Sequence, residues 1–305
     1  MELYGVGNVL LHYREKNEFL QIQVCEGICT EITLSRIEAG EREFDALISE
    51  TLLSRLGKST NRFEFVLNEE DYDYYILREK IEKTVGAFDT ETAKLHIAEY
   101  RENSSFPHKL HEQFLLFYEA MIMKIEGKPK HDVVEQLYKA INLTRPDFLE
   151  SETYFRLYSR LEIKIIYELL LYESFSYESL SGLLQFIDKM YDEEEKGIIL
   201  IPFLYHYAQQ YRQEEKWHKL EDITSRGIAY LQAGRTYAHL VEFQYMNLLA
   251  EYELHKNTAE WDAKRIELIH RCNAIYYMSM TIENFEIMKK AECFCKEQLG
   301  CQITM

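Results

Sequence analysis

The residues best suited to chemistry lie in one short segment, Cys29–Arg42, with the sequence CTEITLSRIEAGER. Thr33 and Arg36 are three residues apart, so on a helix they share one face, where a hydroxyl and a guanidinium group suit hydrogen bonds to bases and phosphates. Leu34 and Ile37 have the same spacing on a neighbouring face that can pack inward. This pattern is typical of a helix that packs on a small domain and enters a DNA groove.

Further polar residues flank this helix. Thr30 is placed to cap its N-terminus, and Gln21 opens a preceding helix, where its amide can donate to a phosphate with help from the helix dipole. Arg36 is ambiguous between a phosphate and a base edge. The predicted DNA-contacting residues are Gln21, Thr30, Glu31, Thr33, Arg36 and Arg42.

Short helices must position these residues. The hydrophobic pattern predicts helices at Val6–Lys16, Gln21–Glu26, Thr30–Ala39 and Phe44–Leu56, the last bounded by Gly57. Helices of this length are marginal in isolation, so these must stabilise one another through packing.

Residues 5–57 resemble the helix-turn-helix domain of the phage-repressor-like (Xre) regulators. The resemblance rests on Arg14, on Gln21 in the pattern "apolar, x, Gln", on the turn Gly27–Cys29, and on Thr30–Gly40, which follows Ser-x-x-Thr-(Leu/Ile)-Ser-Arg-Ile-Glu-x-Gly. It departs from the pattern at Leu20, where a helix-capping residue is usual. The resemblance implies a buried, structural ion pair between Arg14 and Glu38, and these two residues would then not touch DNA.

A different rhythm begins near residue 68, where longer helices alternate with turns. Paired helices begin roughly 40 residues apart, a period typical of helical-hairpin repeats. Small residues such as Ala120, Ala208 and Ala250 stand among large apolar ones, as close helix crossings require. The fold class is therefore all-α: an N-terminal five-helix-type helix-turn-helix domain followed by a tetratricopeptide-like solenoid, with a compact helical bundle as the alternative for the second part. The predicted helices are 69–86, 89–103, 107–127, 131–143, 151–173, 176–191, 194–213, 215–233, 235–256, 258–280 and 282–299.

The fusion of these two parts resembles the peptide-pheromone-sensing regulators of the Rgg/PlcR type from Gram-positive bacteria. The resemblance rests on architecture and covers roughly residues 67–305. It implies that this part binds a short signalling peptide on its concave face and also dimerises. The expected domains are residues 1–66, the helix-turn-helix domain and linker, and residues 67–305, the sensor and dimerisation domain.

A groove for an extended peptide needs hydrogen-bonding groups for the peptide backbone and apolar pockets for its side chains. The segments Tyr205–Tyr211 and Glu242–Asn247 combine amides with aromatic residues. The predicted peptide-binding residues are Tyr207, Gln210, Gln244 and Asn247. Ordinary packing between repeats is the alternative for each of them.

The net charge of −17 is unevenly distributed. Residues 1–66 hold 7 Lys and Arg against 11 Asp and Glu, and the rest of the chain holds 28 against 41. The second part is therefore a poor match for nucleic acid or an anionic membrane, and it favours a peptide with a free amino terminus or basic residues. A solvated acidic surface is the plain alternative. With few cations in residues 1–66, useful DNA affinity is expected from a homodimer on two half-sites.

Other site chemistry is not expected. Cys25 and Cys29 lack a second pair of metal ligands, His108 and His111 do not form the HExxH pattern, and no paired acid and base or phosphate-binding loop is present. We therefore predict no metal, no cofactor and no enzymatic activity. The N-terminus has no signal-peptide pattern and no segment reaches about 18 apolar residues, which predicts a cytoplasmic protein with reduced cysteines.

These observations predict a sequence-specific transcriptional regulator that binds operator DNA as a homodimer and is controlled by a small peptide. The alternative is a helical-repeat interaction scaffold with a vestigial helix-turn-helix domain. A repeat protein that regulates a phosphatase or kinase is a third possibility, against which the N-terminal pattern argues.

Overall fold

The structure is a computed structural model that describes residues 5–42, 46–58, 69–103, 108–149, 155–173, 175–235 and 237–303. Every regular element in these ranges is a helix, and none of the described residues forms a strand, so the predicted all-α class is confirmed. The expected linker falls largely at residues 59–68, which lie outside the described residues. Two compact units make up the chain, Met1–Met190 and Tyr191–Met305.

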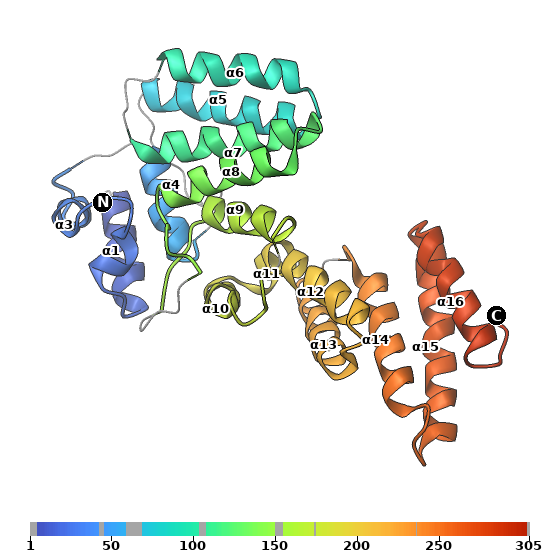
Figure 1. Ribbon diagram of the computed structural model, residues 1–305. Coiled ribbons are helices and arrows are strands. Elements are labelled where there is room, and N and C mark those ends of the chain that lie inside the picture. The colour runs from blue at the N-terminus through green and yellow to red at the C-terminus, as the bar shows by residue number, and fades with distance from the viewer. Residues whose placement is uncertain are drawn as a thin grey trace. The chain divides into compact units, whose positions relative to one another are not determined.

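The first unit begins with four short helices around a common core (Figure 1). Leu10, Val24, Leu34, Ile37 and Leu52 are buried where these helices meet. Thr30 caps the third helix because its hydroxyl accepts a hydrogen bond from the Thr33 N–H at 3.2 Å. The helices are α1 (Val6–Lys16), α2 (Gln21–Cys25), α3 (Glu31–Glu38) and α4 (Ala46–Arg55).

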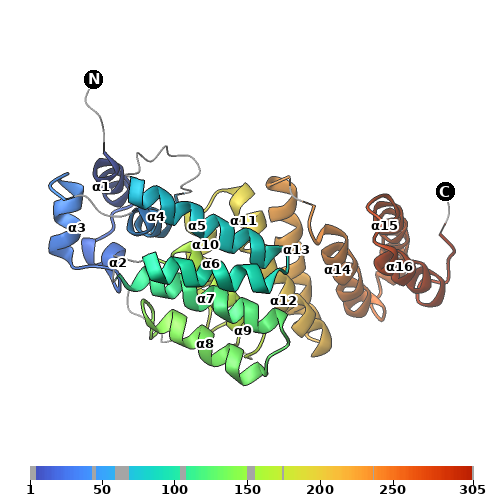
Figure 2. The same ribbon diagram turned by 90° about the horizontal axis from the view of Figure 1, so that it is seen from above.

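Further helices follow in the same unit, and the first four of these, α5 to α8, are longer than the N-terminal ones and pack as antiparallel neighbours. Helices α5 and α6 pack together, as do α7 and α8, and they lie side by side in Figures 1 and 2. The helices are α5 (Glu69–Gly86), α6 (Thr90–Asn103), α7 (Lys109–Ile125), α8 (Lys130–Asn142), α9 (Arg160–Leu170) and α10 (Ser181–Met190).

A buried group of charges joins the N-terminal helices to the longer ones. The Arg55 guanidinium, at the end of α4, donates to Glu162 in α9, with 2.6 Å between Nη2 and Oε1. It also donates to the carbonyl oxygens of Val24 and Glu26 at the end of α2. Arg145 adds a second cation, with its Nε 3.8 Å from Glu162 Oε1 and an ion pair to the Glu26 carboxylate. One charge network thus connects α2, α4 and α9.

Close packing adds to this contact. The Phe19 and Phe155 rings stack with centroids 6.1 Å apart, and the Gln23 amide donates to the Phe155 carbonyl oxygen at 3.1 Å. Gly27 has a φ of +66° and lies so close to the Thr144 carbonyl that a Cβ atom would overlap its oxygen. Glycine is therefore required here both by the backbone conformation and by the approach of a second chain segment.

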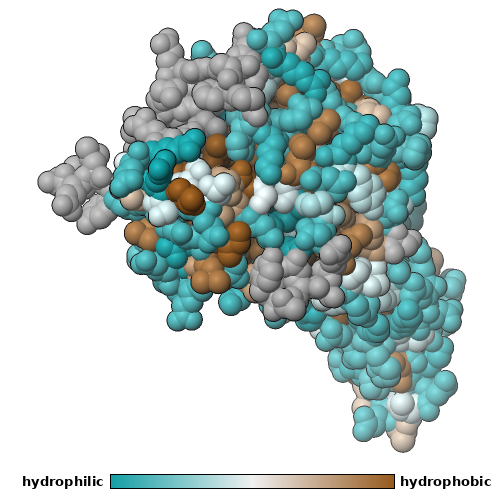
Figure 3. Space-filling model, turned by 60° about the vertical axis from the view of Figure 1, so that its left-hand side comes forward, coloured by the Kyte–Doolittle hydropathy of each residue, from teal (hydrophilic) through white to brown (hydrophobic). Residues whose placement is uncertain are grey.

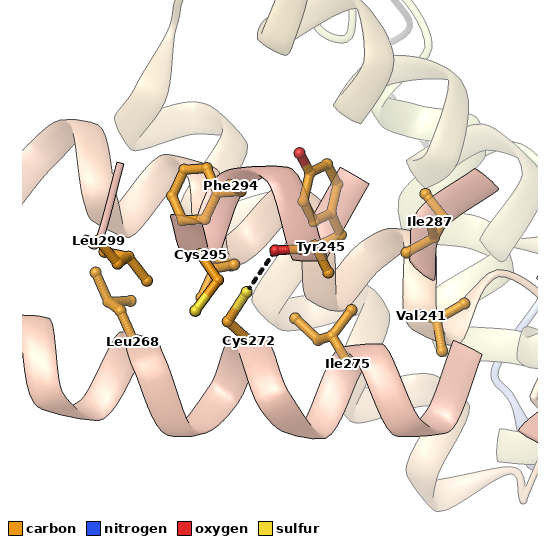
Figure 4. Close-up of a cluster of buried hydrophobic side chains, with 11 residues drawn as sticks. Val241, Tyr245, Leu268, Cys272, Ile275, Ile287, Phe294, Cys295 and Leu299 are labelled. Carbon is orange, nitrogen blue, oxygen red and sulfur yellow. Dashed lines mark hydrogen bonds between the residues drawn. The ribbon is translucent and has the colours of Figure 1, made fainter. Parts of the chain in front are cut away.

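The second unit contains helices that pack in sequence order (Figure 2). Its C-terminal core includes Val241, Leu268, Cys272, Ile275 and Phe294, contributed by three helices (Figure 4). The helices are α11 (Glu193–Ile199), α12 (Ile201–Gln213), α13 (Trp217–Ala233), α14 (Leu240–His255), α15 (Trp261–Thr281) and α16 (Phe285–Glu297).

Most helix bounds agree with the sequence prediction within three residues, and larger differences occur in four places. The helices predicted at 176–191 and 235–256 begin five residues later, at Ser181 and Leu240. Residues 151–154 of the predicted helix 151–173 lie outside the described residues, and α9 begins at Arg160. Ser159 is its N-cap, and the Ser159 N–H donates a hydrogen bond to the Glu162 carboxylate. The predicted helix 194–213 is divided at Leu200, and Pro202 stands in the first turn of α12, where its missing N–H has no cost. Within the described ranges, no helix is both long and apolar enough to span a bilayer.

Candidate DNA-binding face and ligand pocket

An ion pair inside the N-terminal helices orients α3. Arg14 Nε lies 2.6 Å from Glu38 Oε1 and Arg14 Nη2 lies 2.9 Å from Glu38 Oε2, so the contact is bidentate. The hydrogen bond to Glu38 raises the pKa of Arg14, although burial opposes the shift. Glu38 Oε2 also accepts from the Gln21 amide at 2.8 Å. Both charged residues are therefore structural, and Gln21 links the start of α2 to the end of α3.

The start of α2 is capped without a Ser, Thr, Asn or Asp. Leu20 occupies the N-cap position, and its N–H donates to the Gln23 side-chain oxygen at 2.8 Å. The Leu20 side chain is free to face solvent, and it is exposed. The hydrogen bond to Gln23 thus compensates for the missing side-chain cap at Leu20.

The predicted DNA-contacting residues lie mainly on the open surface of the N-terminal helices. Thr30, Glu31, Arg36 and Arg42 are exposed, and Thr33 is half-buried because its hydroxyl lies 3.0 Å from the Thr30 hydroxyl. Gln21 is also half-buried, through its bond to Glu38. The backbone N–H groups in the first turn of α3 point out of the same end, so the helix dipole favours an anion there.

Apolar side chains that are not among the predicted DNA-contacting residues also contribute to this face. Ile32 is 70% exposed in the first turn of α3, and Leu20 and Ile22 at the start of α2 are exposed as well. Figure 3 shows the side of the molecule that carries the N-terminal helices, where hydrophobic residues form separate patches within a largely hydrophilic surface. An exposed isoleucine can contact the methyl group of thymine. The sequence could have indicated this exposure, because Ile32 does not share the helix face of Leu34 and Ile37.

The charge on this face is balanced rather than basic. Arg36 and Arg42 are exposed, but so are Glu31 and Glu41. Each cation that neutralises a phosphate releases counterions, and two cations give only a weak contribution per copy of the chain. The surface is therefore better suited to hydrogen bonds with particular DNA groups than to strong nonspecific attraction to the phosphate backbone.

The second unit contains a pocket of about 260 Å³ lined by α12, α14 and α16. The Tyr205 ring stacks on His239 at 4.3 Å, and Asn284 donates to the Glu242 carboxylate at 2.9 Å. Both signs of charge are present. The lining residues are Tyr205, Gln209, Arg212, Glu242, Tyr245, Met246, Asn284, Glu286, Ile287 and Lys290.

The predicted peptide-binding residues lie in α12 and α14, two of the three helices that line this pocket, but none of the four lines it. Tyr207 has 0% exposure and packs in the core. Asn247 is buried and donates to Thr224 Oγ1 at 2.9 Å while its side-chain oxygen accepts from Arg271 at 2.6 Å. The side chains of Tyr207 and Asn247 thus belong to helix packing, which corrects the role predicted for them.

The other two predicted residues are half-buried. The Gln210 amide donates to Glu214 at 2.9 Å, within its own helix. Gln244 has a buried side-chain oxygen that accepts no hydrogen bond from the residues the structure describes. The residues that line the pocket lie one or two positions along each helix, at Gln209 and Glu242. The two predicted segments therefore contribute residues to the pocket, but through positions other than the four that were predicted.

A second cavity, of about 420 Å³, lies in the first unit between α4, α5, α7 and α9. Its wall includes the Arg78–Glu50 ion pair, at 3.1 Å, and the side chain of Lys164. Within the described part of the chain, no group of three or more His, Cys, Asp or Glu residues is placed to hold a metal ion.

No protein-family model matches this chain, and no curated protein matches it. Several solved structures are similar to it. ComR from S. thermophilus, in complex with DNA and its signalling peptide ComS, is 15% identical, with 97% of this chain and 100% of that chain covered and a TM-score of 0.42. The SHP pheromone receptor Rgg2 from Streptococcus dysgalactiae is 10% identical, with 94% and 98% covered and a TM-score of 0.43. PrgX in its complex with iCF10 is 16% identical, with 95% and 97% covered and a TM-score of 0.37. The first of these structures contains DNA and a signalling peptide, and the second is described as a pheromone receptor.

Proposed function

We propose that this protein is a sequence-specific transcriptional regulator that binds operator DNA through α3 and is controlled by a short peptide. The observation that carries the proposal is the division of α3 into two faces. Leu34, Ile37 and Glu38 are buried, while Glu31 and Arg36 remain exposed. A helix built in this way is held firmly from behind and presents a polar surface of the size that a major groove accepts.

Five residues of the N-terminal helices and the segment after α3 have roles in this proposal. Thr33 and Arg36 contact base edges or phosphates on the groove side of α3, and Ile32 adds an apolar contact. Arg42 binds a backbone phosphate beyond the helix. Gln21 positions the start of α2 against a phosphate, with its bond to Glu38 fixing the orientation of its amide.

The balanced charge of this face supports binding as a homodimer. A single copy offers Arg36 and Arg42 as exposed cations in the third-helix region. Two copies on two half-sites double the phosphate contacts and add the advantage of linked binding. In this proposal residues 1–66 supply the DNA-binding domain and linker, and residues 67–305 supply the helical-repeat sensor and the dimer contact.

We place the peptide in the pocket between α12, α14 and α16. Glu242 and Glu286 suit a peptide amino terminus or a basic side chain, and Arg212 and Lys290 suit a carboxylate. Gln209 is exposed at the pocket and carries an amide that can both donate to and accept from a peptide backbone.

The DNA-binding half of the proposal is tested by salt dependence. The purified full chain is titrated into a labelled duplex from upstream of its own gene, and anisotropy is recorded at several salt concentrations. A dimer with two phosphate-bound cations per copy predicts a slope of about −3.6 for log K against log salt, and a monomer about half of that. No binding to upstream or other genomic DNA at low salt would support the scaffold alternative instead.

The peptide half has a matched pair of variants. Synthetic peptides from short reading frames beside the gene are titrated calorimetrically against the full chain. Gln209→Ala is expected to weaken the binding of the active peptide, and Gln210→Ala, one residue further and outside the pocket, is expected to leave it unchanged. Equal effects of the two changes, or no effect of Gln209→Ala, would place the peptide elsewhere.

A further inference from the structure

The turn between α2 and α3 brings two thiol groups together. Cys25 is the last residue of α2, and Cys29 immediately precedes Thr30, the cap of α3. The Cys29 N–H donates to the Cys25 carbonyl oxygen at 3.0 Å, which closes one turn of the chain between the two residues. The two thiols are close enough to shift the pKa of one another. We propose that Cys25 and Cys29 are a reversible oxidation site, where hydrogen peroxide or an organic hydroperoxide joins the two thiols in an intrachain disulfide.

The surroundings of Cys29 favour its thiolate. The pKa of Cys29 is lowered first by the hydrogen bond from the Cys25 thiol and then by the positive charges of Arg55, Arg42 and Lys109, while burial opposes these effects. Cys29 is half-buried whereas Cys25 is buried, so Cys29 is the more open of the two to a small peroxide. The thiolate is the nucleophilic form of cysteine, and reactive cysteines occur in such positively charged, partly exposed places.

Cys25 is the complementary partner. It is fully buried, and its pKa is raised, chiefly by the hydrogen bond to Cys29 and by burial, so it keeps its proton. A buried thiol beside an accessible thiolate cannot meet the oxidant first, but it can react with the oxidised neighbour. The order of reaction is therefore Cys29 first and Cys25 second.

The chemistry balances with the peroxide as the only co-reactant. The Cys29 sulfur attacks the terminal oxygen of ROOH, the O–O bond breaks, and ROH leaves after taking up a proton, which gives Cys29–SOH. The Cys25 sulfur then attacks the Cys29 sulfur, the S–O bond breaks, and water leaves with the Cys25 proton. In sum, two thiols and ROOH give one disulfide, ROH and water, and two electrons pass from the sulfurs to the peroxide.

The C-terminal thiols provide a contrast. Cys272 and Cys295 lie in the apolar cluster of Figure 4, where both are fully buried and the Cys272 thiol donates to the Ala291 carbonyl at 3.0 Å. Burial raises the pKa of Cys272 to about 12, and it also raises the pKa of Cys295. Contact between two thiols is therefore not sufficient for oxidation by peroxide. No cation contributes to the pKa shifts of Cys272 and Cys295, and both are buried, unlike Cys29.

Peptide mapping of the oxidised full chain tests the proposal. Trypsin cleaves after Lys16 and Arg36, and the fragment Asn17–Arg36 contains Cys25 and Cys29 but none of the other cysteines. The chain is treated with hydrogen peroxide, free thiols are blocked with N-ethylmaleimide in denaturant, and the digest is analysed by mass spectrometry without reduction. The fragment is expected to lose two hydrogen atoms and to take up no blocking group, and dithiothreitol is expected to restore both blocking sites.

Two controls accompany the measurement. In the same digest, the fragment that contains Cys272 is expected to remain blocked as a free thiol. The variant Cys29→Ser is expected to leave Cys25 reduced and blocked, whereas Cys293→Ser, at an exposed cysteine, is expected to change nothing in the fragment. Blocking of both Cys25 and Cys29 after a peroxide dose that oxidises Cys293 would overturn the proposal, as would oxidation of Cys29 beyond sulfenic acid with Cys25 still free. The readout is independent of DNA binding.

Discussion

Arg55 and Glu162 form an ion pair across 107 residues of the chain, and neither side chain is exposed to solvent. Arg55 belongs to the last of the four N-terminal helices, whereas Glu162 lies in the first turn of α9. The same guanidinium also holds the carbonyl group of Val24, at 3.0 Å. The N-terminal helices are therefore held to the following helices by an ion pair that is shielded from solvent.

The variant Glu162→Gln tests the energetic weight of this contact. It leaves the buried Arg55 guanidinium without its paired carboxylate, and loss of one partner of a buried pair costs about 3–5 kcal/mol. Urea denaturation of the full chain should show this loss in the transition of the first unit. The control is Glu168→Gln, which removes a more exposed ion pair to Lys124 and should cost less than about 1 kcal/mol. Similar small changes for both variants would contradict the structural role of Glu162.

The same carboxylate predicts a dependence on pH. Burial alone would raise the pKa of Glu162, but Arg55 and Arg145 outweigh it and hold the pKa at about 2, below its ordinary value of 4.5. Because the folded-state pKa is depressed, the stability from this group is present above pH 4.5 and is lost as the pH falls towards 2. The difference in unfolding free energy between the wild type and Glu162→Gln should shrink across this window. A constant difference would exclude the linkage.

Alanine variants at two glycines distinguish the stability cost of close packing from that of backbone strain. Gly27 and Gly40 both have positive φ, +66° and +71°, but only Gly27 faces another segment, the Thr144 carbonyl. Gly40→Ala should cost about 1–2 kcal/mol, the strain of a left-handed backbone alone. Gly27→Ala should cost clearly more, since the added methyl group forces α2 away from Thr144. Thermal unfolding measures both, and equal losses would show that the contact at Gly27 adjusts freely.

Two residues of α12, two positions apart, test which side of this helix faces the core and which faces the pocket. Tyr207→Ala removes a completely buried ring and should destabilise the chain by about 3–5 kcal/mol, as other large core truncations do. Gln209→Ala changes an exposed pocket residue and should alter stability by less than about 0.5 kcal/mol. Denaturant unfolding measures the free energy of unfolding of both variants. A small effect of Tyr207→Ala would contradict its role in the core and would favour a role in ligand binding.

The N-terminal helices could be predicted closely because their signals are local. The bounds of α1 agree with the sequence prediction, and Thr30 caps α3 as expected. The spacing of Leu34 and Ile37 predicted the buried face, since a short amphipathic helix has one apolar side. These features depend on residues within a few positions of one another.

Other features depend on distant partners and left no local pattern. Arg55 and Glu162 have no spacing that relates them, and the docking of α2 and α4 on α9 follows from the tertiary fold. In α12 apolar residues occupy more than one side, so the sequence could not tell that Tyr207 faces the core while Tyr205 and Gln209 line a pocket. A helix that packs on two neighbours has no single hydrophobic stripe.

The central claim, that α3 binds DNA, is tested most directly by the double variant Thr33→Ala and Arg36→Ala. Its affinity for the upstream duplex is measured by anisotropy at low salt beside the wild type and the charge-matched control Lys83→Ala, at an exposed lysine of α5. The account predicts that the double variant loses binding while its unfolding midpoint stays close to that of the wild type, and that Lys83→Ala binds normally. Undiminished binding by a folded double variant would contradict the claim.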